Sequence, residues 1–408
     1  MAIAGLYRLR VWGLVLATAC AAGVFVMSLT NAYTLPRPIA PSLALTSAAQ
    51  KWAYASGTQA VVKGTSADFV VEVNSVTGVV DFVDLEFEAL DASTAGQSSI
   101  AAFVISSPTV SMLRTTLTAG TGMTGASGAV GGTGTPSGAL AGNNAVDTTP
   151  GAQCSITCST GGASTGGGGG TAATAFAGAP GTVAQSTPTP ATATGAGGTV
   201  TQCASNTGGA NGSDAFPVTM ADSPGATASG TLDATGWNPG DGQPGGNGAP
   251  GQGGGGGASA GGGGGGGACG GCGGVGGGFG AGGGASIALL AFGSPVSLTS
   301  CTVSASTAGA GGAGAAGGPG QTGGARGTGS GTACNGGNGG IGSQGGAGGG
   351  GAGGLSVGVL YSGAASAPVV TGGTIMPGAA GAFGPGGDPG VNDGSAGVSA
   401  MTQDATML

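Results

Sequence analysis

Cysteine is the residue type in this chain whose number and placement most clearly predict chemistry. The sequence of 408 residues contains eight cysteines. Cys20 lies in an apolar N-terminal run, and Cys301 lies in a predicted strand, where we expect a small buried side chain. The other six are an even number in a chain with an export segment, which predicts a disulfide framework. These six are Cys154, Cys158, Cys203, Cys269, Cys272 and Cys334.

Some of these cysteines also fit other chemistry. Cys154 and Cys158, together with Cys269-Gly-Gly-Cys272, offer four thiolates, which is the ligand number of a structural zinc site. A Cys-x-x-Cys pair is by itself a redox motif, but no thioredoxin-like βαβ pattern surrounds this one. In an exported chain without histidine, disulfides are favoured over both alternatives. The pairing of the six cysteines stays open.

An acidic stretch is the second group of residues that could carry out a reaction. Asp81, Asp84, Glu86 and Glu88 alternate along a predicted strand, and Arg114 lies near the next predicted strands. Paired carboxylates are the catalytic residues of polysaccharide-cleaving enzymes, and clustered carboxylates bind cations. Acids at alternating positions are also typical of the solvated face of a strand, and we expect that arrangement here. We therefore predict no catalytic, cofactor-binding or metal-binding residues.

The composition excludes several classes of function. The chain has no histidine, which rules out a Ser-His-Asp triad, a histidine base and a histidine metal ligand. Lys and Arg together number 7 against 15 Asp and Glu, so there is no basic patch and nucleic acid is not expected as a partner. Charged residues make up 5% of the chain, whereas about 25% is usual in globular domains. We expect no enzyme activity and no cofactor.

Recurring β-rich segments supply the predicted framework. Each copy has a β-rich run, a turn of small residues, and a second run that ends in Thr and an aliphatic residue. The copies begin at Ser99, Ser286 and Ser356, and a looser copy begins at Phe69. A lone pair of short strands is marginal in water, so the copies must stack. Because they recur in the same direction, we predict an all-β fold of parallel β-helix-like solenoid coils, with an antiparallel sandwich as the alternative.

Glycine-rich arrays leave and re-enter these copies. Glycine recurs at every third position from Gly122 to Gly134, from Gly336 to Gly354 and from Gly378 to Gly390. A period of three is that of an extended polyproline-type helix, and glycine at each third position lets neighbouring main chains touch. We predict long polyglycine II-type arms. Flexible linkers are the alternative, because ordering each glycine costs about 1–2 kcal/mol in backbone entropy.

The N-terminus has the pattern of an export segment. Arg8 and Arg10 precede an apolar run from Val11 to Leu29, and the small residue Ala32 follows. The run is also long enough for a retained membrane helix, and Cys20 lies in a sequence that resembles a bacterial lipoprotein box. Each option places the rest of the chain outside the cytoplasm. We expect a secreted or cell-surface protein of the bacterial envelope that contacts the membrane only through this segment.

These patterns divide the chain into eight segments. They are a signal peptide or anchor (1–32), a linker (33–64), the first β-solenoid segments (65–120), a Gly/Ala/Thr-rich insert with cysteines (121–284), a second β coil (285–308), a Gly-rich arm (309–354), a third β coil (355–377) and a Gly-rich C-terminal tail (378–408). Trp237 opens a returning array. We expect it to anchor the base of that array, with stacking on a sugar as the alternative.

The region from about 65 to 400 resembles the Gly-rich secreted proteins of predatory soil bacteria that carry a PE-PGRS-like label. The resemblance lies in Ser286-Ile-Ala-Leu-Leu-Ala-Phe, in Val296-Ser-Leu-Thr-Ser-Cys-Thr-Val, in Ala268-Cys-Gly-Gly-Cys before them and in the Gly-Ala array after them. The N-terminal PE domain is missing, so the functional content of that label does not transfer. The resemblance implies a β-helix-like surface or secreted protein and assigns no functional residues.

Together these features predict a non-enzymatic secreted or cell-surface structural or adhesive protein. Its expected partner is a cell surface, a matrix or a polysaccharide. One alternative is a polysaccharide-acting β-helix enzyme that uses the acidic stretch. The other is an ice- or surface-binding polyglycine bundle, because glycine helices side by side present a regular array of small groups.

Overall fold

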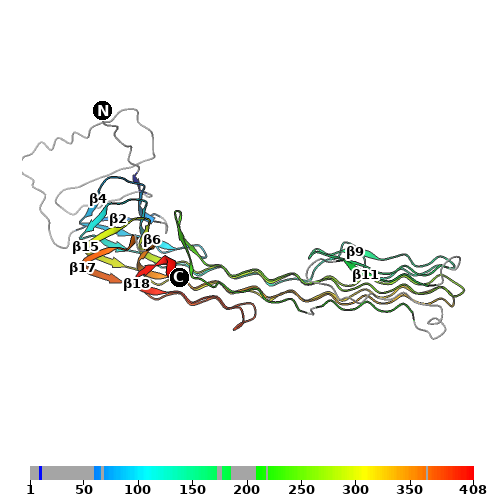
Figure 1. The fold of residues 1–408 in the computed structure, drawn as a ribbon. Helices are drawn as coiled ribbons and strands as arrows, with labels where there is room; N and C mark the ends of the chain where they lie inside the picture. Colours follow the sequence, from blue (N-terminus) through cyan, green and yellow to red (C-terminus); the bar gives the residue numbers. More distant parts are fainter. Residues whose placement is uncertain are drawn as a thin grey trace, which may run out of the picture.

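The computed structural model describes residues 9–11, 59–65, 69–171, 177–184, 208–216, 219–363 and 366–408. Cys20, Cys203 and nearly all of the predicted export segment lie outside the described residues. Within these ranges the fold is all-β, as predicted, and contains no α-helix. A head of short strands continues into a long, thin arm (Figure 1). No helix in the described part of the chain is long and apolar enough to cross a bilayer.

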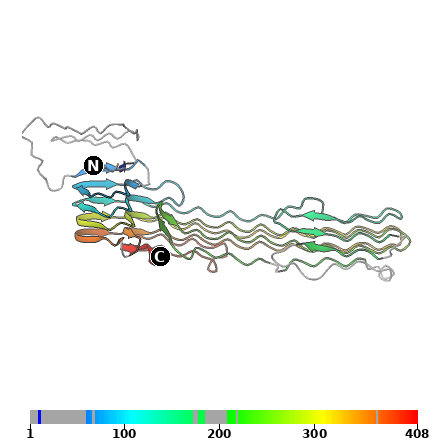
Figure 2. The same ribbon diagram turned by 45° about the horizontal axis from the view of Figure 1, so that its top comes forward.

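The strands of the head form two sheets, and Figure 2 shows that successive passes of the chain stack as layers, in sequence order. Sheet A has the order β1-β3-β6-β14-β16-β18, formed by β1 (Leu9–Val11), β3 (Phe69–Asn74), β6 (Ser99–Ile105), β14 (Ser286–Phe292), β16 (Ser356–Tyr361) and β18 (Ser399–Asp404). Sheet B has the order β2-β5-β8-β15-β7-β4, with β17 paired to β15. Its members are β2 (Ala60–Lys63), β4 (Val80–Val83), β5 (Leu85–Glu88), β7 (Val110–Leu113), β8 (Thr116–Thr118), β15 (Val296–Ser304) and β17 (Val369–Met376).

Each β-rich copy gives strands to both sheets. The chain runs along β14, turns, and returns as β15, and the copy of β16 and β17 repeats this path. Strands at equivalent positions pair in parallel register, so that Ser286 lies beside Ser99 on one side and Ser356 on the other. Only β1 pairs antiparallel to its neighbour in sheet A. The parallel pairing of the copies contradicts the antiparallel sandwich.

The main hydrophobic core lies between the two sheets. Strands β6 and β14 are buried along almost their whole length, which explains their nearly continuous apolar sequences. One face of sheet A shares this core with sheet B side chains such as Met112 and Leu298. The other face forms a second cluster that includes Phe103, Leu290 and Trp237. Sheet A is therefore the rigid base from which the arm leaves.

A bend recurs at the same place in successive strands of sheet B. Asp84, Arg114 and Ser300 have φ angles of 55°, 49° and 51°, and Gly372 continues the series at 68°. Left-handed backbone costs a non-glycine residue free energy, so it persists only where the surroundings determine it. Here the N–H of Arg114 donates to the carbonyl of Thr299 in the next layer at 2.9 Å. The stacking of equivalent bends thus keeps the sheets hydrogen-bonded through the distortion.

Buried serines join the head to the arm. Ser286, at the start of β14, is fully buried, and its hydroxyl donates to the carbonyl of Gly120 at 2.7 Å and accepts from the N–H of Ser306 at 2.8 Å. Ser356 repeats the pattern one layer on, donating to the carbonyl of Ser306 and accepting from the N–H of Gly378, both at 2.7 Å. A hydroxyl both donates and accepts. Each serine therefore satisfies two peptide groups where the chain passes between strand and arm.

The substitution Ser286→Ala is expected to destabilise the head by about 1–3 kcal/mol, because the Gly120 carbonyl and the Ser306 N–H lose their partner. The matched control is Ser399→Ala on β18. Ser399 donates to the carbonyl of Gly378 in an exposed position, where water replaces the lost bond, so a change within about 0.5 kcal/mol is expected. Denaturant unfolding of both variants measures the difference. Equal losses at the two positions would contradict a role of burial at the joint.

Strands also form outside the predicted copies. A three-stranded sheet on the arm contains β9 (Ser155–Thr157), β10 (Ala163–Thr165) and β11 (Thr182–Ala184), and a hairpin beside the head contains β12 (Gly230–Asp233) and β13 (Gly236–Pro239). Strand β18 lies in the segment that the sequence analysis treated as a glycine-rich tail, and a short 3-10 turn, η2 (Ala405–Met407), follows it. The weakly apolar sequence of β18 carries no strand pattern of its own. Its pairing with β16 supplies the structure.

Candidate functional site

The arm is a bundle of extended segments that hydrogen-bond along their length (Figures 1 and 2). In the segment 262–284, the N–H groups of residues 265, 268, 271, 274, 277, 280 and 283 donate to carbonyls of the segment 334–352. The N–H groups of residues 266, 269, 275, 278, 281 and 284 donate to carbonyls of the segment 123–143. Contacts with one neighbour thus recur every third residue, which is the period of a polyproline-type helix.

Two further segments surround the segment 262–284. The N–H groups of residues 242, 245, 248, 251 and 254 donate to its carbonyls from one side. The N–H groups of residues 312, 315, 318, 321, 324 and 327 donate to its carbonyls from another. The segment 262–284 is therefore a central chain of the bundle, and we call it the central segment.

Glycine is required in the central segment because neighbouring peptide groups occupy the place of a side chain. A Cβ on Gly274 would lie 1.9 Å from the carbonyl oxygen of Gly318, and a Cβ on Gly271 would lie 1.9 Å from that of Gln321. Both distances are far below a van der Waals contact. The main chains can approach this closely only where Cβ is absent.

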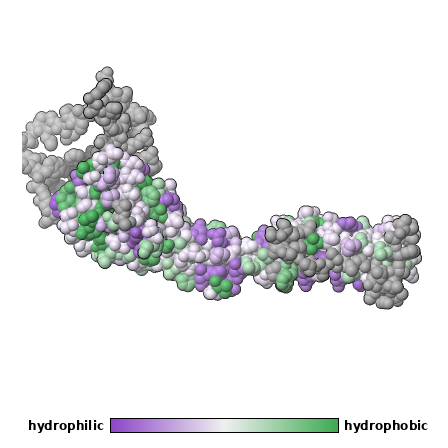
Figure 3. Space-filling model, viewed as in Figure 1, coloured by the Kyte–Doolittle hydropathy of each residue, from purple (hydrophilic) through white to green (hydrophobic). Residues whose placement is uncertain are grey.

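Outer segments of the bundle need glycine on one side only. In 122–134, a Cβ on Gly125 would lie 2.0 Å from the carbonyl oxygen of Ala281, whereas Gly132 has nothing within 4 Å of the same position. Val130, between these two glycines, is 75% exposed. Figure 3 shows that the outer surface of the arm is mostly of intermediate hydropathy with hydrophilic patches, while the larger apolar areas lie on the head.

Two disulfides tie strand β9 and its flanks to the central segment. Cys154 is bonded to Cys269, and Cys158 is bonded to Cys272. These four cysteines form an apolar cluster with Ile156, against which Leu140 packs. The arm is thus cross-linked around a small core in a region that otherwise depends on peptide hydrogen bonds.

The other cysteines also differ in whether they are bonded, buried or described. Cys334 is also disulfide-bonded, and Cys203 lies outside the described residues. Cys301 is a buried free thiol in β15, as expected, and burial raises its pKa. Because Cys269 and Cys272 are each bonded to a distant cysteine, they are not a redox pair with one another. Their sulfurs, and those of their partners, are likewise not thiolate ligands for zinc.

Asparagine and aspartate side chains extend the hydrogen bonding at the rim of the bundle. A carboxylate oxygen of Asp214 accepts from the N–H of Ile341 at 2.7 Å, and Asp222 accepts from the N–H of Ala347 at 2.9 Å. Asn211 accepts from the N–H of Asn338 at 2.9 Å. These residues were not predicted from the sequence. Their signal was the spacing of three between Asn211 and Asp214, which repeats the glycine period.

The acidic stretch of sheet B is engaged in surface ion pairs. Arg114 donates through Nε and Nη2 to the two carboxylate oxygens of Asp84, each at 2.7 Å. The hydrogen bond from this guanidinium holds the pKa of Asp84 below its usual value. Lys63 Nζ lies 2.7 Å from a carboxylate oxygen of Glu88. A glycosidase needs a carboxylic acid whose pKa is raised, and the environment of Asp84 acts in the opposite direction.

The other two predicted acids lie on two strands of the same sheet that do not pair with each other. Asp81 lies on β4 and accepts a hydrogen bond from the hydroxyl of Ser111 on β7. Glu86 lies on β5 beside Thr116 of β8. The structure therefore brings the acidic residues onto one sheet, as their alternation predicted, and pairs several of them with partners on adjacent strands.

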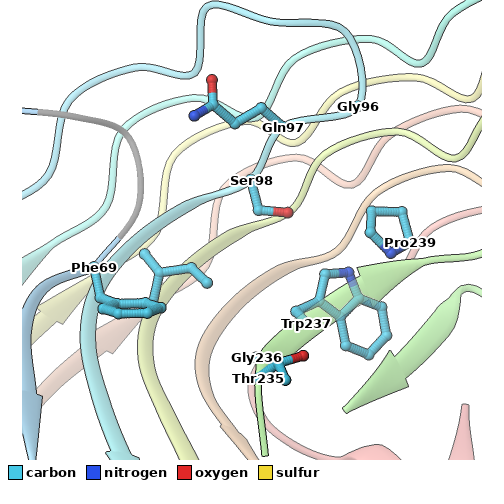
Figure 4. A pocket seen from close by; sticks show the side chains of 9 residues that line it. Phe69, Gly96, Gln97, Ser98, Thr235, Gly236, Trp237 and Pro239 are labelled. Carbon is cyan, nitrogen blue, oxygen red and sulfur yellow. The ribbon is translucent and has the colours of Figure 1, made fainter. Parts of the chain in front are cut away.

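A cleft of about 200 Å³ lies where the hairpin of β12 and β13 meets the head (Figure 4). Its lining consists of Phe69, Gly96, Gln97, Ser98, Ile100, Thr235, Gly236, Trp237 and Pro239. The side chain of Trp237 packs into the second core and is only 7% exposed, and its indole N–H is buried without a hydrogen-bond partner. Trp237 therefore anchors the base of the returning segment. Its burial contradicts the alternative of an exposed platform for a sugar.

No protein-family model, curated protein or solved structure matches this chain. Its function is therefore inferred from the geometry of the head and the arm.

Proposed function

We propose that this protein is a non-enzymatic secreted or cell-surface protein whose arm acts as a rigid structural or adhesive element. The observation that carries the proposal is the hydrogen bonding of the central segment to four neighbouring segments, cross-linked by two disulfides. A flexible linker would need neither feature. At about 3.1 Å per residue, the central segment spans about 70 Å. An element of this length holds the head and the far end of the arm at a set distance.

In this proposal the head is a small β-solenoid and the arm is built from long excursions between its coils. Supporting this view, β14 with β15 and β16 with β17 repeat the same path, and the serines at the coil starts lie in register. Each coil of a solenoid contacts only its neighbours, so a long insertion between coils is tolerated. The stacked coils then set the spacing at which the arm segments emerge and pair.

The location outside the cytoplasm is supported by the disulfides, which persist in oxidising compartments. The sequence pattern of the N-terminus agrees with export. The proposed absence of enzyme activity rests on the composition, which lacks histidine and is poor in charged residues, and Asp84 of the acidic stretch is engaged in an ion pair with Arg114. A cell surface, a matrix or a polysaccharide remains the expected partner class.

The proposal is tested by small-angle scattering of the purified exported chain, together with binding and turnover assays. Scattering should show an elongated particle with a stiff extension of about 70 Å. The labelled protein should bind bacterial cells or a polysaccharide matrix and should leave uronate polymers intact. A scattering profile typical of a compact head with coil-like tethers would refute the rigid arm. Polymer cleavage that disappears in Asp84→Ala would establish the enzyme alternative instead.

A further inference from the structure

The layers of the head, in chain order, are β3 with β4 and β5, β6 with β7 and β8, β14 with β15, β16 with β17, and β18. The first four give strands to both sheets, whereas the described part of the fifth gives a strand to sheet A only. In the fourth layer, β16 lies in sheet A and β17 in sheet B. In the fifth layer, β18 pairs with β16, but no described strand pairs with the outer edge of β17, whose partner is β15. In the described part of the chain the head therefore ends in a step one strand wide beside β18. We call the outer edges of β17 and β18 the C-terminal edge.

Strand β17 of the C-terminal edge carries few of the features that usually protect an edge strand, although Pro368 and Pro377 flank it. Natural edges carry charges, prolines or bulges that prevent pairing with another chain. Residues 369–376 contain neither a charge nor a proline. The left-handed Gly372 is not an edge device, since Arg114 and Ser300 form the same bend within the sheet.

Several apolar side chains at this edge are open to solvent, among threonines and other polar residues. Val370 of β17 is 43% exposed and Met401 of β18 is 61% exposed, and Val369 and Met376 are also exposed. Ile375 is only partly buried where it packs against the main core. The core is thus left uncapped at the C-terminal end of the stack. Asp404, the charged residue of β18, accepts hydrogen bonds from the N–H groups of Gly363 and Thr406.

We infer that the C-terminal edge binds the same edge of a second copy of this chain, related by a two-fold axis. The opposite end of the stack carries charges of both signs, with Asp81 on β4 and Lys63 on β2, which pairs outside β5. Such a charged end does not complement an edge whose exposed side chains include valine and methionine and no basic residue. Two C-terminal edges do complement each other. In a two-fold pair, β18 of each copy enters the step beside the partner's β18 and covers the edge of the partner's β17. Such an interface stops at two copies, because the step at the end of each head is occupied by β18 of the other.

The experiment compares the full exported chain with two matched variants by sedimentation and light scattering at micromolar concentrations. Val370→Lys places an ammonium group on β17, and Val83→Lys places the same group on β4 at the opposite end. Both valines lie in strands and are 43% exposed. The wild type and Val83→Lys should be dimers. Val370→Lys should raise the dimer Kd by roughly a hundredfold or more, because two unpaired ammonium groups would be buried together.

A second variant covers the case in which Val370→Lys does not fold. Met401→Lys changes a more exposed side chain on β18 and should also abolish dimerisation while keeping the thermal unfolding midpoint of the wild type. A monomeric wild type would overturn the inference. So would a dimer that survives both edge variants, or one that Val83→Lys dissociates. Assemblies that grow beyond the dimer would show head-to-tail stacking and would overturn the two-fold arrangement.

Discussion

Replacing Gly274 with alanine is expected to disrupt the arm, whereas the same replacement at Gly132 is expected to leave it intact or slightly more stable. A Cβ on Gly274 would lie 1.9 Å from the carbonyl oxygen and 2.5 Å from the carbonyl carbon of Gly318. Both atoms belong to a main chain that is itself hydrogen-bonded to Val275, so it cannot move aside alone. Overpacking of a side chain costs about 1–3 kcal/mol, and a clash with a hydrogen-bonded backbone should reach or exceed that range.

Gly132 differs from Gly274 in its surroundings, and this difference decides whether alanine stabilises or destabilises the arm. It lies in an outer segment, and an added Cβ would have no atom within 4 Å. Alanine at such a site restricts the unfolded chain more than glycine does and stabilises by about 0.4–1 kcal/mol. Amide hydrogen exchange across 262–284 in the two variants measures the outcome. Unchanged protection in Gly274→Ala would show that the segments are not packed at the distances described.

The glycine pattern predicted the period of the arm. It also indicates which segments lie in the centre of the bundle and which lie at its surface, and this was not predicted. In 122–134, glycine recurs every third residue because one side of the segment faces its neighbours. In 261–267, glycine fills every position, so no period is visible in the sequence. The hydrogen bonds nevertheless keep the period of three there. Uninterrupted glycine therefore indicates a chain surrounded on several sides, and spaced glycine indicates a chain at the surface.

The strand copies and their direction were readable from sequence because apolar runs recur with the same internal order. Strand β18 was not, since it depends on pairing with β16 rather than on its own residues. The serines at the starts of the strand copies were visible as a repeat at Ser286 and Ser356. Their role as bridges between strand and arm was not visible, because it depends on which distant peptide groups lie beside them.

For the cysteines, too, the local sequence predicted one feature, that they form disulfides, but did not predict which cysteines pair. Their even number in a chain with an export pattern predicted disulfides, and four of the described cysteines form two disulfides with one another. The pairing depends on the register between segments separated by 115 and 114 residues, which nothing local encodes. The acidic stretch was predicted as a strand face, but the guanidinium of Arg114 on Asp84 required knowledge of the parallel register.

Removing the second of the two disulfides is expected to lower the free energy of unfolding much more than removing the first. This holds although each bond closes a loop of nearly the same length. With both bonds absent, the unfolded chain gains the freedom of a loop of 115 residues, which corresponds to about 5 kcal/mol in the chain-entropy model. With one bond kept, that long loop stays closed. The other bond then closes only the short ring between Cys154, Cys158, Cys269 and Cys272, for which the same model gives about 2–3 kcal/mol.

Alanine pairs at 154 with 269, at 158 with 272, and at all four positions measure this directly in denaturant unfolding under oxidising conditions. Each pair alone should lower the free energy of unfolding by about 2–3 kcal/mol, and the fourfold variant by about 7–8 kcal/mol. Loss of packing around Ile156 contributes to every variant, but it should add in proportion to the number of cysteines removed. The excess loss in the fourfold variant therefore isolates the cross-link from the packing. Strict additivity of the two pairs would mean that the disulfides act by local contacts and do not tie β9 to the central segment in the unfolded chain.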